Sequence, residues 1–177
     1  MLFFTDPLRT LTPGATAARL PRGCGVVFRA FGADDAIERG RALARVCRAR
    51  RLTLLVGADP VLAARLDADG VHLPQRLAGR AGLVRALRAR FLLTAAAHDL
   101  PAALRARRAG VDALIVSPIF ASNSPSAGRP MGAFALARLT RAARIPVYAL
   151  GGVNADTARA LKLTGIVGLA AVEALGG

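Results

Sequence analysis

The sequence predicts an α/β fold, a compact (β/α)8 or TIM barrel in which residues 1–177 form a single domain. Eight short apolar runs alternate with longer segments of helical pattern. Nearly continuous apolar runs are typical of parallel strands that are buried on both faces. Strict alternation of strand and helix favours a parallel sheet with right-handed crossovers, and eight such units are the number that closes a barrel.

The expected strands are brief and almost entirely apolar. In chain order they are residues 2–5, 25–28, 52–56, 70–73, 91–94, 113–116, 147–150 and 165–168. The expected helices between them are residues 34–50, 60–66, 83–89, 100–109, 134–143 and 155–161. Asp99 and Asn154 are expected to cap helices at their N-termini, and Gly110 is expected to end one. Residues 8–20 lack a clear pattern, and residues 170–175 are expected to form a last short helix.

An open, doubly wound sheet is the alternative architecture for this alternation. Such sheets usually carry a glycine-rich dinucleotide-binding sequence after the first strand. Here the first strand is followed by Asp6-Pro7-Leu8, so the closed barrel is the preferred prediction.

The composition excludes several classes of protein. Hydrophobic residues make up 54% of the chain, which argues against disorder, and no apolar run approaches the ~20 residues of a membrane-spanning helix. No secretion signal is recognisable at the start. Two cysteines, Cys24 and Cys47, are too few for a disulfide framework. A cytoplasmic location is therefore the expectation, with no membrane partner.

The formal net charge of +14 comes almost entirely from arginine, and Lys162 is the only lysine. The arginines are scattered rather than arranged as a basic stripe with interleaved aromatic residues, so no specific nucleic-acid partner is predicted. We expect this charge on a solvated surface, with some salt-sensitive affinity for polyanions. The sequence is compatible with a homo-oligomer but does not determine the number of subunits.

Two titratable or charged residues lie at or just after the C-terminal ends of expected strands. Active sites of (β/α)8 barrels lie at the C-terminal ends of the strands. His98 follows one of these strands and is a candidate general acid or base. Arg29 ends an apolar strand, where a charge needs an anionic partner, and it is the second candidate catalytic residue. His72 lies within an apolar strand and is interpreted as a hydrogen-bonded structural histidine.

The glycines after the seventh expected strand predict a phosphate site. That strand ends in Gly151-Gly152. Glycines let the backbone approach a ligand, and a helix N-terminus after the last strand would offer free N–H groups. Barrels commonly bind phosphate at this place, although glycines also serve simply to turn the chain. No carboxylate pair or histidine cluster has metal-ligand spacing, so no metal site is predicted.

The longest irregular connection, residues 117–132, is rich in serine, proline and glycine. Loops of that length within a compact domain usually serve in binding. We expect Ser117, Asn123 and Ser124 in this loop, and Gln75 at the end of the fourth strand, to contact the substrate.

Taken in order, these segments resemble the thiamine phosphate synthase and TenI family, whose members are (β/α)8 barrels. The most specific are the runs Asp69-Gly70-Val71-His72-Leu73-Pro74-Gln75 and Pro146-Val147-Tyr148-Ala149-Leu150-Gly151-Gly152. The segments Leu2-Phe3-Phe4-Thr5-Asp6 and Ser117-Pro118-Ile119-Phe120 and the surroundings of His98 keep the family's order and spacing. The resemblance therefore spans nearly the whole chain.

The resemblance implies an enzyme of thiamine metabolism whose ligand is a small phosphorylated heterocycle. The synthases join a hydroxymethylpyrimidine pyrophosphate to a thiazole phosphate with Mg²⁺, whereas TenI-type tautomerases shift a proton on a thiazole carboxylate phosphate without a metal. In both, the phosphate binds at the double glycine and the last helix N-terminus, which implies Gly151, Gly152 and the backbone of Val172 and Glu173 here. The tautomerase histidine at the place of His98 is the proposed acid and base.

Departures from the synthase pattern favour proton transfer. The synthase Mg²⁺ carboxylates align with Ala58 and Leu77, and its lysines align with Phe31 and with residues 121–125. Departure of pyrophosphate needs charge neutralisation, so a metal-independent thiazole tautomerase without a cofactor is the first hypothesis. A divergent synthase, with Mg²⁺ held by Asp6 or Asp59, is one alternative. A non-catalytic phosphate-ligand binding or regulatory barrel is the other.

Overall fold

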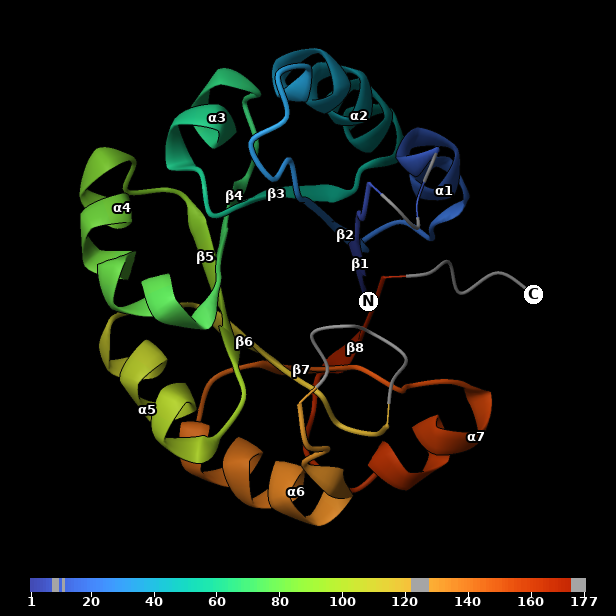
Figure 1. Ribbon diagram of the computed structural model, residues 1–177, viewed down its shortest axis with the longest axis vertical. Helices are drawn as coiled ribbons and strands as arrows, with labels where there is room; N and C mark the ends of the chain where they lie inside the picture. Colours follow the sequence, from blue (N-terminus) through green and yellow to red (C-terminus); the bar gives the residue numbers. More distant parts are fainter. Residues whose placement is uncertain (8–9, 11, 122–127, 173–177) are drawn as a thin grey trace.

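The strands of this chain close into a single parallel barrel. The computed structural model describes residues 1–7, 10, 12–121 and 128–172, and in this part of the chain eight strands pair in the order β1 to β8. The last strand pairs with the first, Leu2 opposite Ala170 and Phe3 opposite Ala171. Helices surround the strands (Figure 1). The predicted (β/α)8 fold class is confirmed.

The elements are short throughout. The strands are β1 Leu2–Phe4, β2 Gly25–Phe28, β3 Thr53–Gly57, β4 Gly70–Leu73, β5 Leu92–Ala97, β6 Ala113–Val116, β7 Val147–Leu150 and β8 Gly168–Ala171. The α-helices are α1 Pro13–Arg19, α2 Ala36–Arg50, α3 Pro60–Arg65, α4 Ala81–Leu87, α5 Leu100–Arg108, α6 Gly132–Ala143 and α7 Ala155–Ala158. Two 3₁₀ helices, η1 Gln75–Arg80 and η2 Arg159–Leu161, complete the set in the described residues.

The expected helix caps are present and hold helix starts at the C-terminal ends of two strands. The Asp99 carboxylate, after β5, accepts a hydrogen bond from the backbone N–H of Ala102 at 2.6 Å. Asn154, after β7, caps α7 in a reciprocal arrangement with Thr157. Gly110 has a φ of +89°, the left-handed conformation that commonly follows a helix end.

The predicted bounds of the last strand, residues 165–168, were wrong. β8 begins at Gly168, three residues after the expected start, because strand position depends on pairing and not on the apolar run alone. Gly168 lies opposite Tyr148 of β7, and a Cβ atom there would lie 2.9 Å from the tyrosine ring. Gly165, with a φ of +78°, lies in the connection before β8.

The expected helix of residues 170–175 is also wrong at its start. Ala170 and Ala171 are strand residues, and Val172 lies in a bend directly after β8. Residues 173–175 fall outside the described residues. In contrast, α1 lies in the segment that lacked a clear pattern, and Pro13 begins it at a position where proline is well tolerated.

Side chains alternate between the barrel interior and the layer under the helices. One buried cluster consists of Leu2, Phe4, Val27, Leu55, Ile115 and Ala170, which come from five strands. The neighbouring residues Phe3, Val26, Phe28 and Leu54 belong to the larger cluster that includes the buried helix residues. This alternation is the period of two expected for strands, applied to a sheet buried on both faces.

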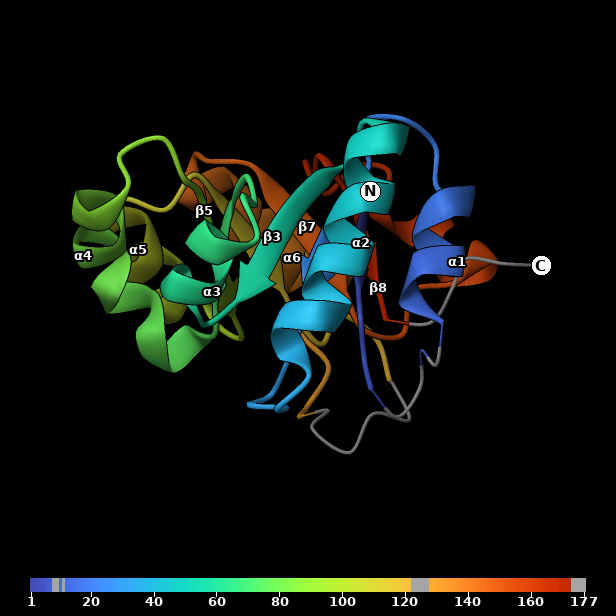
Figure 2. The same cartoon turned by 90° about the horizontal axis from the view of Figure 1, so that it is seen from above.

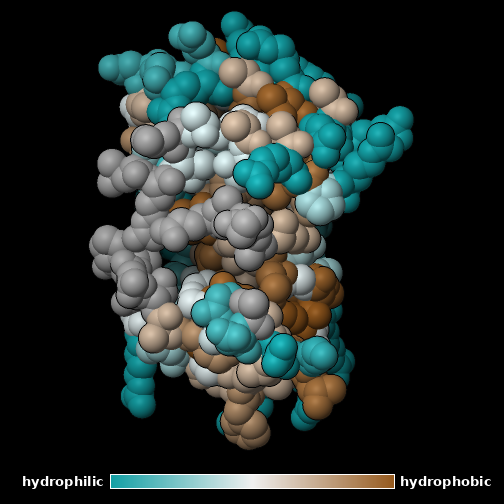
Figure 3. Space-filling model, turned by 90° about the vertical axis from the view of Figure 1, so that its right-hand side faces the viewer, coloured by the Kyte–Doolittle hydropathy of each residue, from teal (hydrophilic) through white to brown (hydrophobic). Residues whose placement is uncertain are grey.

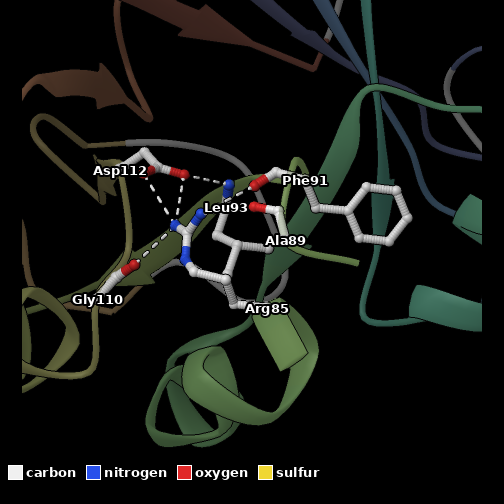
Figure 4. Close-up of polar contacts among 6 residues, drawn as sticks. All are labelled: Arg85, Ala89, Phe91, Leu93, Gly110 and Asp112. Carbon is white, nitrogen blue, oxygen red and sulfur yellow. Dashed lines mark hydrogen bonds and ion pairs between the residues drawn. The ribbon is translucent and has the colours of Figure 1, made fainter. Parts of the chain in front are cut away.

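Arginine and aspartate side chains organise the N-terminal end of the barrel. Nη2 of Arg85, on α4, lies 2.9 Å from both carboxylate oxygens of Asp112 and 3.0 Å from the carbonyl oxygen of Gly110 (Figure 4). The same carboxylate accepts a 2.7 Å hydrogen bond from the Leu93 N–H of β5. Asp69, directly before β4, makes the same kind of contact with β3. Its carboxylate accepts a 2.7 Å hydrogen bond from the Leu54 N–H.

The surface carries the charge that the composition predicts. No arginine among the described residues is buried. On the face that carries α1 and α7, hydrophobic residues gather around and below the middle of the view, with hydrophilic residues above and below them (Figure 3). A search of the described residues finds no helix that is long and apolar enough to cross a membrane.

We predict that Asp112→Ala destabilises the fold because it leaves the Leu93 N–H without its carboxylate acceptor. The expected loss in the free energy of unfolding is about 1 to 3 kcal/mol. Urea denaturation followed by circular dichroism measures it. Asp67→Ala is the matched control, since the Asp67 side chain is 72% exposed and its ion pair with Arg88 should contribute less than about 1 kcal/mol. Equal losses in the two variants would contradict this role of Asp112.

Candidate active site

The C-terminal strand ends bring most of the expected site residues to one end of the barrel. Figure 2 shows the turn between β2 and α2 and the segment before α6 at the same end. Thr5, Arg29, His98, Ser117 and Gly151 each directly follow a strand there. Parallel strands place these positions together although they lie far apart in the sequence.

His98, Gln75 and Ser117 form one contact group across β4, β5 and β6. The side-chain oxygen of Gln75 accepts a 2.8 Å hydrogen bond from the backbone N–H of His98. Nδ1 of His98 lies 2.6 Å from the carbonyl oxygen of Ser117 and 3.4 Å from its hydroxyl. The structure therefore places three of the expected site residues side by side.

The contact with Ser117 determines the tautomer of His98. A carbonyl oxygen can only accept a hydrogen bond, so Nδ1 must carry the proton. In the neutral ring, Nε2 is then the unprotonated nitrogen. A histidine whose orientation is held by a carbonyl acceptor, and whose other nitrogen has a lone pair, has the form of a general base.

Arg29 is part of an ion pair within the chain. Its Nη2 atom lies 3.0 Å from the carboxylate of Asp6, and its Nε donates to the Thr5 carbonyl oxygen at 2.6 Å. Its backbone N–H donates to the Thr5 hydroxyl at 3.0 Å. The anionic partner expected for Arg29 is thus Asp6, which follows the neighbouring strand β1. A catalytic role for Arg29 stays a prediction.

His72 is buried inside the barrel, as expected for a structural histidine. Its Nδ1 lies 2.9 Å from the Thr94 hydroxyl on β5. Its ring meets that of Phe4 edge-on, with centroids 5.0 Å apart. Burial lowers the pKa of His72 to about 3, with a smaller contribution from the positive charge of Arg29. His72 therefore stays neutral in the folded protein at physiological pH.

The double glycine is required by the packing of the loop after β6. Gly151 and Gly152 have φ values of +92° and +66°. A Cβ atom on Gly152 would lie 2.3 Å from the carbonyl oxygen of Ala121. The Phe120 N–H donates to the Gly151 carbonyl oxygen at 3.0 Å, which fixes this close approach. Phosphate binding at these glycines stays a prediction, because the loop contact alone explains why they are glycines.

The remaining expected contacts are placed only in part. Val172 directly follows β8, and its carbonyl oxygen accepts a hydrogen bond from the Thr10 hydroxyl at 3.4 Å. Glu173, Asn123 and Ser124 lie outside the described residues. Their expected roles therefore stay predictions.

Comparison with known proteins relates this geometry to a family. The family model described as thiamine monophosphate synthase matches residues 13–175. The chain belongs to this thiamine monophosphate synthase family. A thiamine-phosphate synthase of Alcanivorax borkumensis is 33% identical over 180 residues, which cover 98% of this chain and 83% of that protein.

Two further relatives agree with this family. A thiamine-phosphate synthase of Chloroflexus aurantiacus is 37% identical over 140 residues, 78% of this chain. That match spans 64% of the Chloroflexus protein, so the chain covers less than two thirds of this relative's length. A solved thiamine phosphate pyrophosphorylase of Pyrococcus furiosus is similar in structure, with a TM-score of 0.82 and 25% identity over 97% of this chain and 84% of that one.

The described residues do not fit the Mg²⁺ site that the resemblance implies for a synthase. Magnesium prefers carboxylate oxygens, and the two aligned positions hold Ala58 and Leu77. The Asp59 carboxylate accepts a 2.8 Å hydrogen bond from the Leu62 N–H and caps α3, while Asp6 pairs with Arg29. Among the described residues, no group of three or more histidine, cysteine, aspartate or glutamate side chains is arranged to hold a metal.

We predict a pH dependence of stability caused by His72. The unfolded chain takes up a proton near pH 6.5, whereas the folded protein does not until near pH 3. Stability should therefore fall as the pH drops below 6.5, by about 2 kcal/mol between pH 7 and pH 5. Urea denaturation at both pH values measures this loss. His72→Gln should remove most of it, and an unchanged pH dependence in this variant would contradict the assignment.

We also predict that Gly152→Ala destabilises the protein more than Gly32→Ala does. Both glycines have a positive φ, but Gly32 faces open space and Gly152 faces the Ala121 carbonyl. The backbone strain alone costs about 1 kcal/mol, and the clash at Gly152 should at least double that loss. Chemical denaturation of the two variants gives the comparison. Similar losses would mean that the loop after β6 can move away from the glycine without loss of stability.

Proposed function

We propose that this chain binds a thiazole phosphate at the C-terminal end of its barrel and acts on it. The observation that carries this proposal is the contact group of Gln75, His98 and Ser117 beside the double glycine, in a member of the thiamine monophosphate synthase family. These residues come from β4 to β7, so a ligand whose phosphate lies at Gly151 and Gly152 would present its ring near His98.

Coupling of the thiazole phosphate to a pyrimidine pyrophosphate is the reaction that the relatives favour. The Chloroflexus and Alcanivorax relatives reported above are named as thiamine-phosphate synthases. Proton transfer, the first hypothesis from the sequence, has less support from these relatives. We therefore place coupling first, although Ala58 and Leu77 leave this chain without the expected carboxylates. Charge on the departing pyrophosphate would then have to be compensated by other groups.

Proton transfer on the thiazole phosphate is the second candidate, and the geometry of His98 favours it. With Nδ1 donating to the Ser117 carbonyl oxygen, Nε2 can accept a proton from the ligand and return it to another ring atom. The Ser117 carbonyl oxygen stabilises the imidazolium that forms in between. The side-chain oxygen of Gln75 accepts a hydrogen bond from the His98 backbone N–H and so helps to position this residue.

One set of assays separates the two reactions. The purified chain is first titrated with thiazole phosphate by calorimetry, which tests the shared proposal. Thiamine phosphate and pyrophosphate are then measured after addition of the pyrimidine pyrophosphate, with and without Mg²⁺. In parallel, nuclear magnetic resonance follows interconversion of the thiazole carboxylate phosphate isomers. Product that depends on both substrates supports coupling, and isomer conversion without Mg²⁺ supports proton transfer.

We predict that His98→Gln lowers isomer conversion by about 100-fold or more, which is the usual contribution of a positioned acid or base. Arg105→Gln, on the outer helix α5, serves as the control and should keep full activity. Unchanged conversion in the His98 variant would remove the acid and base role. Tight binding of thiazole phosphate with neither reaction would support a non-catalytic binding barrel, and no binding would overturn the proposed function.

A further inference from the structure

An exposed aromatic ring lies in the turn after β2. Phe31 is 69% exposed and has a φ of +50°, and Gly32 beside it has a φ of +78°. The Ala33 N–H donates to the Ala30 carbonyl oxygen at 3.0 Å, which closes a tight turn with both central residues in the left-handed region. A bulky residue is unfavourable in this conformation, and such outliers gather at functional sites.

The ring of Phe31 covers the guanidinium of Arg29. The central carbon of that group lies 5.2 Å from the Phe31 ring centroid and 5.8 Å from the Phe4 ring centroid. Phe4 is buried and meets His72 edge-on. Phe31, Arg29, Phe4 and His72 therefore form a continuous series of contacts from the rim of the barrel to its interior, which we call the rim column.

The rim column is held in place by hydrogen bonds of Arg29. Its Nε and Nη2 atoms donate to Thr5 and Asp6, and its side chain is 25% exposed. A guanidinium fixed in this way gives the Phe31 ring a fixed support on one side. Because most of the Phe31 ring is still exposed, it offers a stacking surface whose position is set before a ligand arrives.

We propose that Phe31 is a specificity residue that stacks on the heteroaromatic ring of the substrate at the C-terminal end of the barrel. This inference rests on the proposed function, because it assumes a ligand that has both an aromatic ring and a phosphate. Thiazole and pyrimidine rings are planar and stack on aromatic side chains with offset geometry. Phe31 then selects for the ring, whereas the strand ends near the double glycine select for the phosphate.

The test compares ligands with and without a ring. Calorimetry measures the Kd of thiazole phosphate, of hydroxymethylpyrimidine phosphate and of ethyl phosphate, which has no ring. Phe31→Leu should raise the Kd of at least one ring phosphate by about 3- to 10-fold. The Kd of ethyl phosphate should rise by less than about 2-fold. Phe31→Tyr, which keeps the aromatic ring, should restore binding. Phe134→Leu is the matched control, since Phe134 is 79% exposed on α6 and should leave every Kd unchanged.

A second variant separates loss of the ring from loss of stability. Phe31→Gly removes the ring and also relieves the unfavourable φ, so its melting temperature should equal or exceed that of the unchanged chain. It should lose ring binding to the same extent as Phe31→Leu. A loss of similar size for ring phosphates and ethyl phosphate would overturn the proposal, because Phe31 would then act only by supporting Arg29.

The remaining outcomes separate this inference from the proposed function. If the unchanged chain binds thiazole phosphate and no Phe31 variant alters binding of either ring phosphate, the inference alone fails. If the unchanged chain binds the pyrimidine phosphate through Phe31 but not thiazole phosphate, the proposed function fails and the stacking role stands. If it binds neither ring phosphate, both fail.

Discussion

Parallel pairing of neighbouring strands around the whole barrel, from β1 to β8 and back to β1, is the constraint on which the candidate site depends. This pairing closes a sheet of very short strands, and closure brings all C-terminal strand ends to one rim. Each important contact of the site joins residues that follow neighbouring strands. Arg29 after β2 reaches Asp6 after β1, and His98 after β5 reaches Ser117 after β6. An open sheet would separate β1 from β8 and leave the rim incomplete.

The charges at this rim are largely satisfied within the chain, despite the high net charge of the protein. Arg29 pairs with Asp6, and the Asp59 carboxylate is used to cap a helix. In the neutral ring of His98 the lone pair is on Nε2, because Nδ1 donates to the carbonyl oxygen of Ser117. The rim therefore combines a fixed cation with an oriented imidazole, and the arginines of the outer helices take no part in this arrangement.

Membership of the thiamine monophosphate synthase family and departure from its expected metal carboxylates coexist in this chain. The backbone framework and the segments near His98 and the double glycine follow the family, whereas Ala58 and Leu77 have no side-chain oxygen that could bind a metal. Phe31 adds an aromatic surface at a position where the resemblance expects a lysine. A phosphorylated ring is compatible with both sets of features, because a ring can stack and a phosphate can approach the glycine backbone.

The sequence by itself determined the fold class, the first and last residues of four strands, and the two helix caps of Asp99 and Asn154. Apolar runs bounded by turns define short buried strands well, and a cap is a local hydrogen bond between residues close in sequence. Only the tertiary structure decided the start of β8, the partner of Arg29 and the tautomer of His98. Each of these depends on a neighbouring strand or loop, and pairing across a barrel is a contact over long sequence distance that local pattern does not contain.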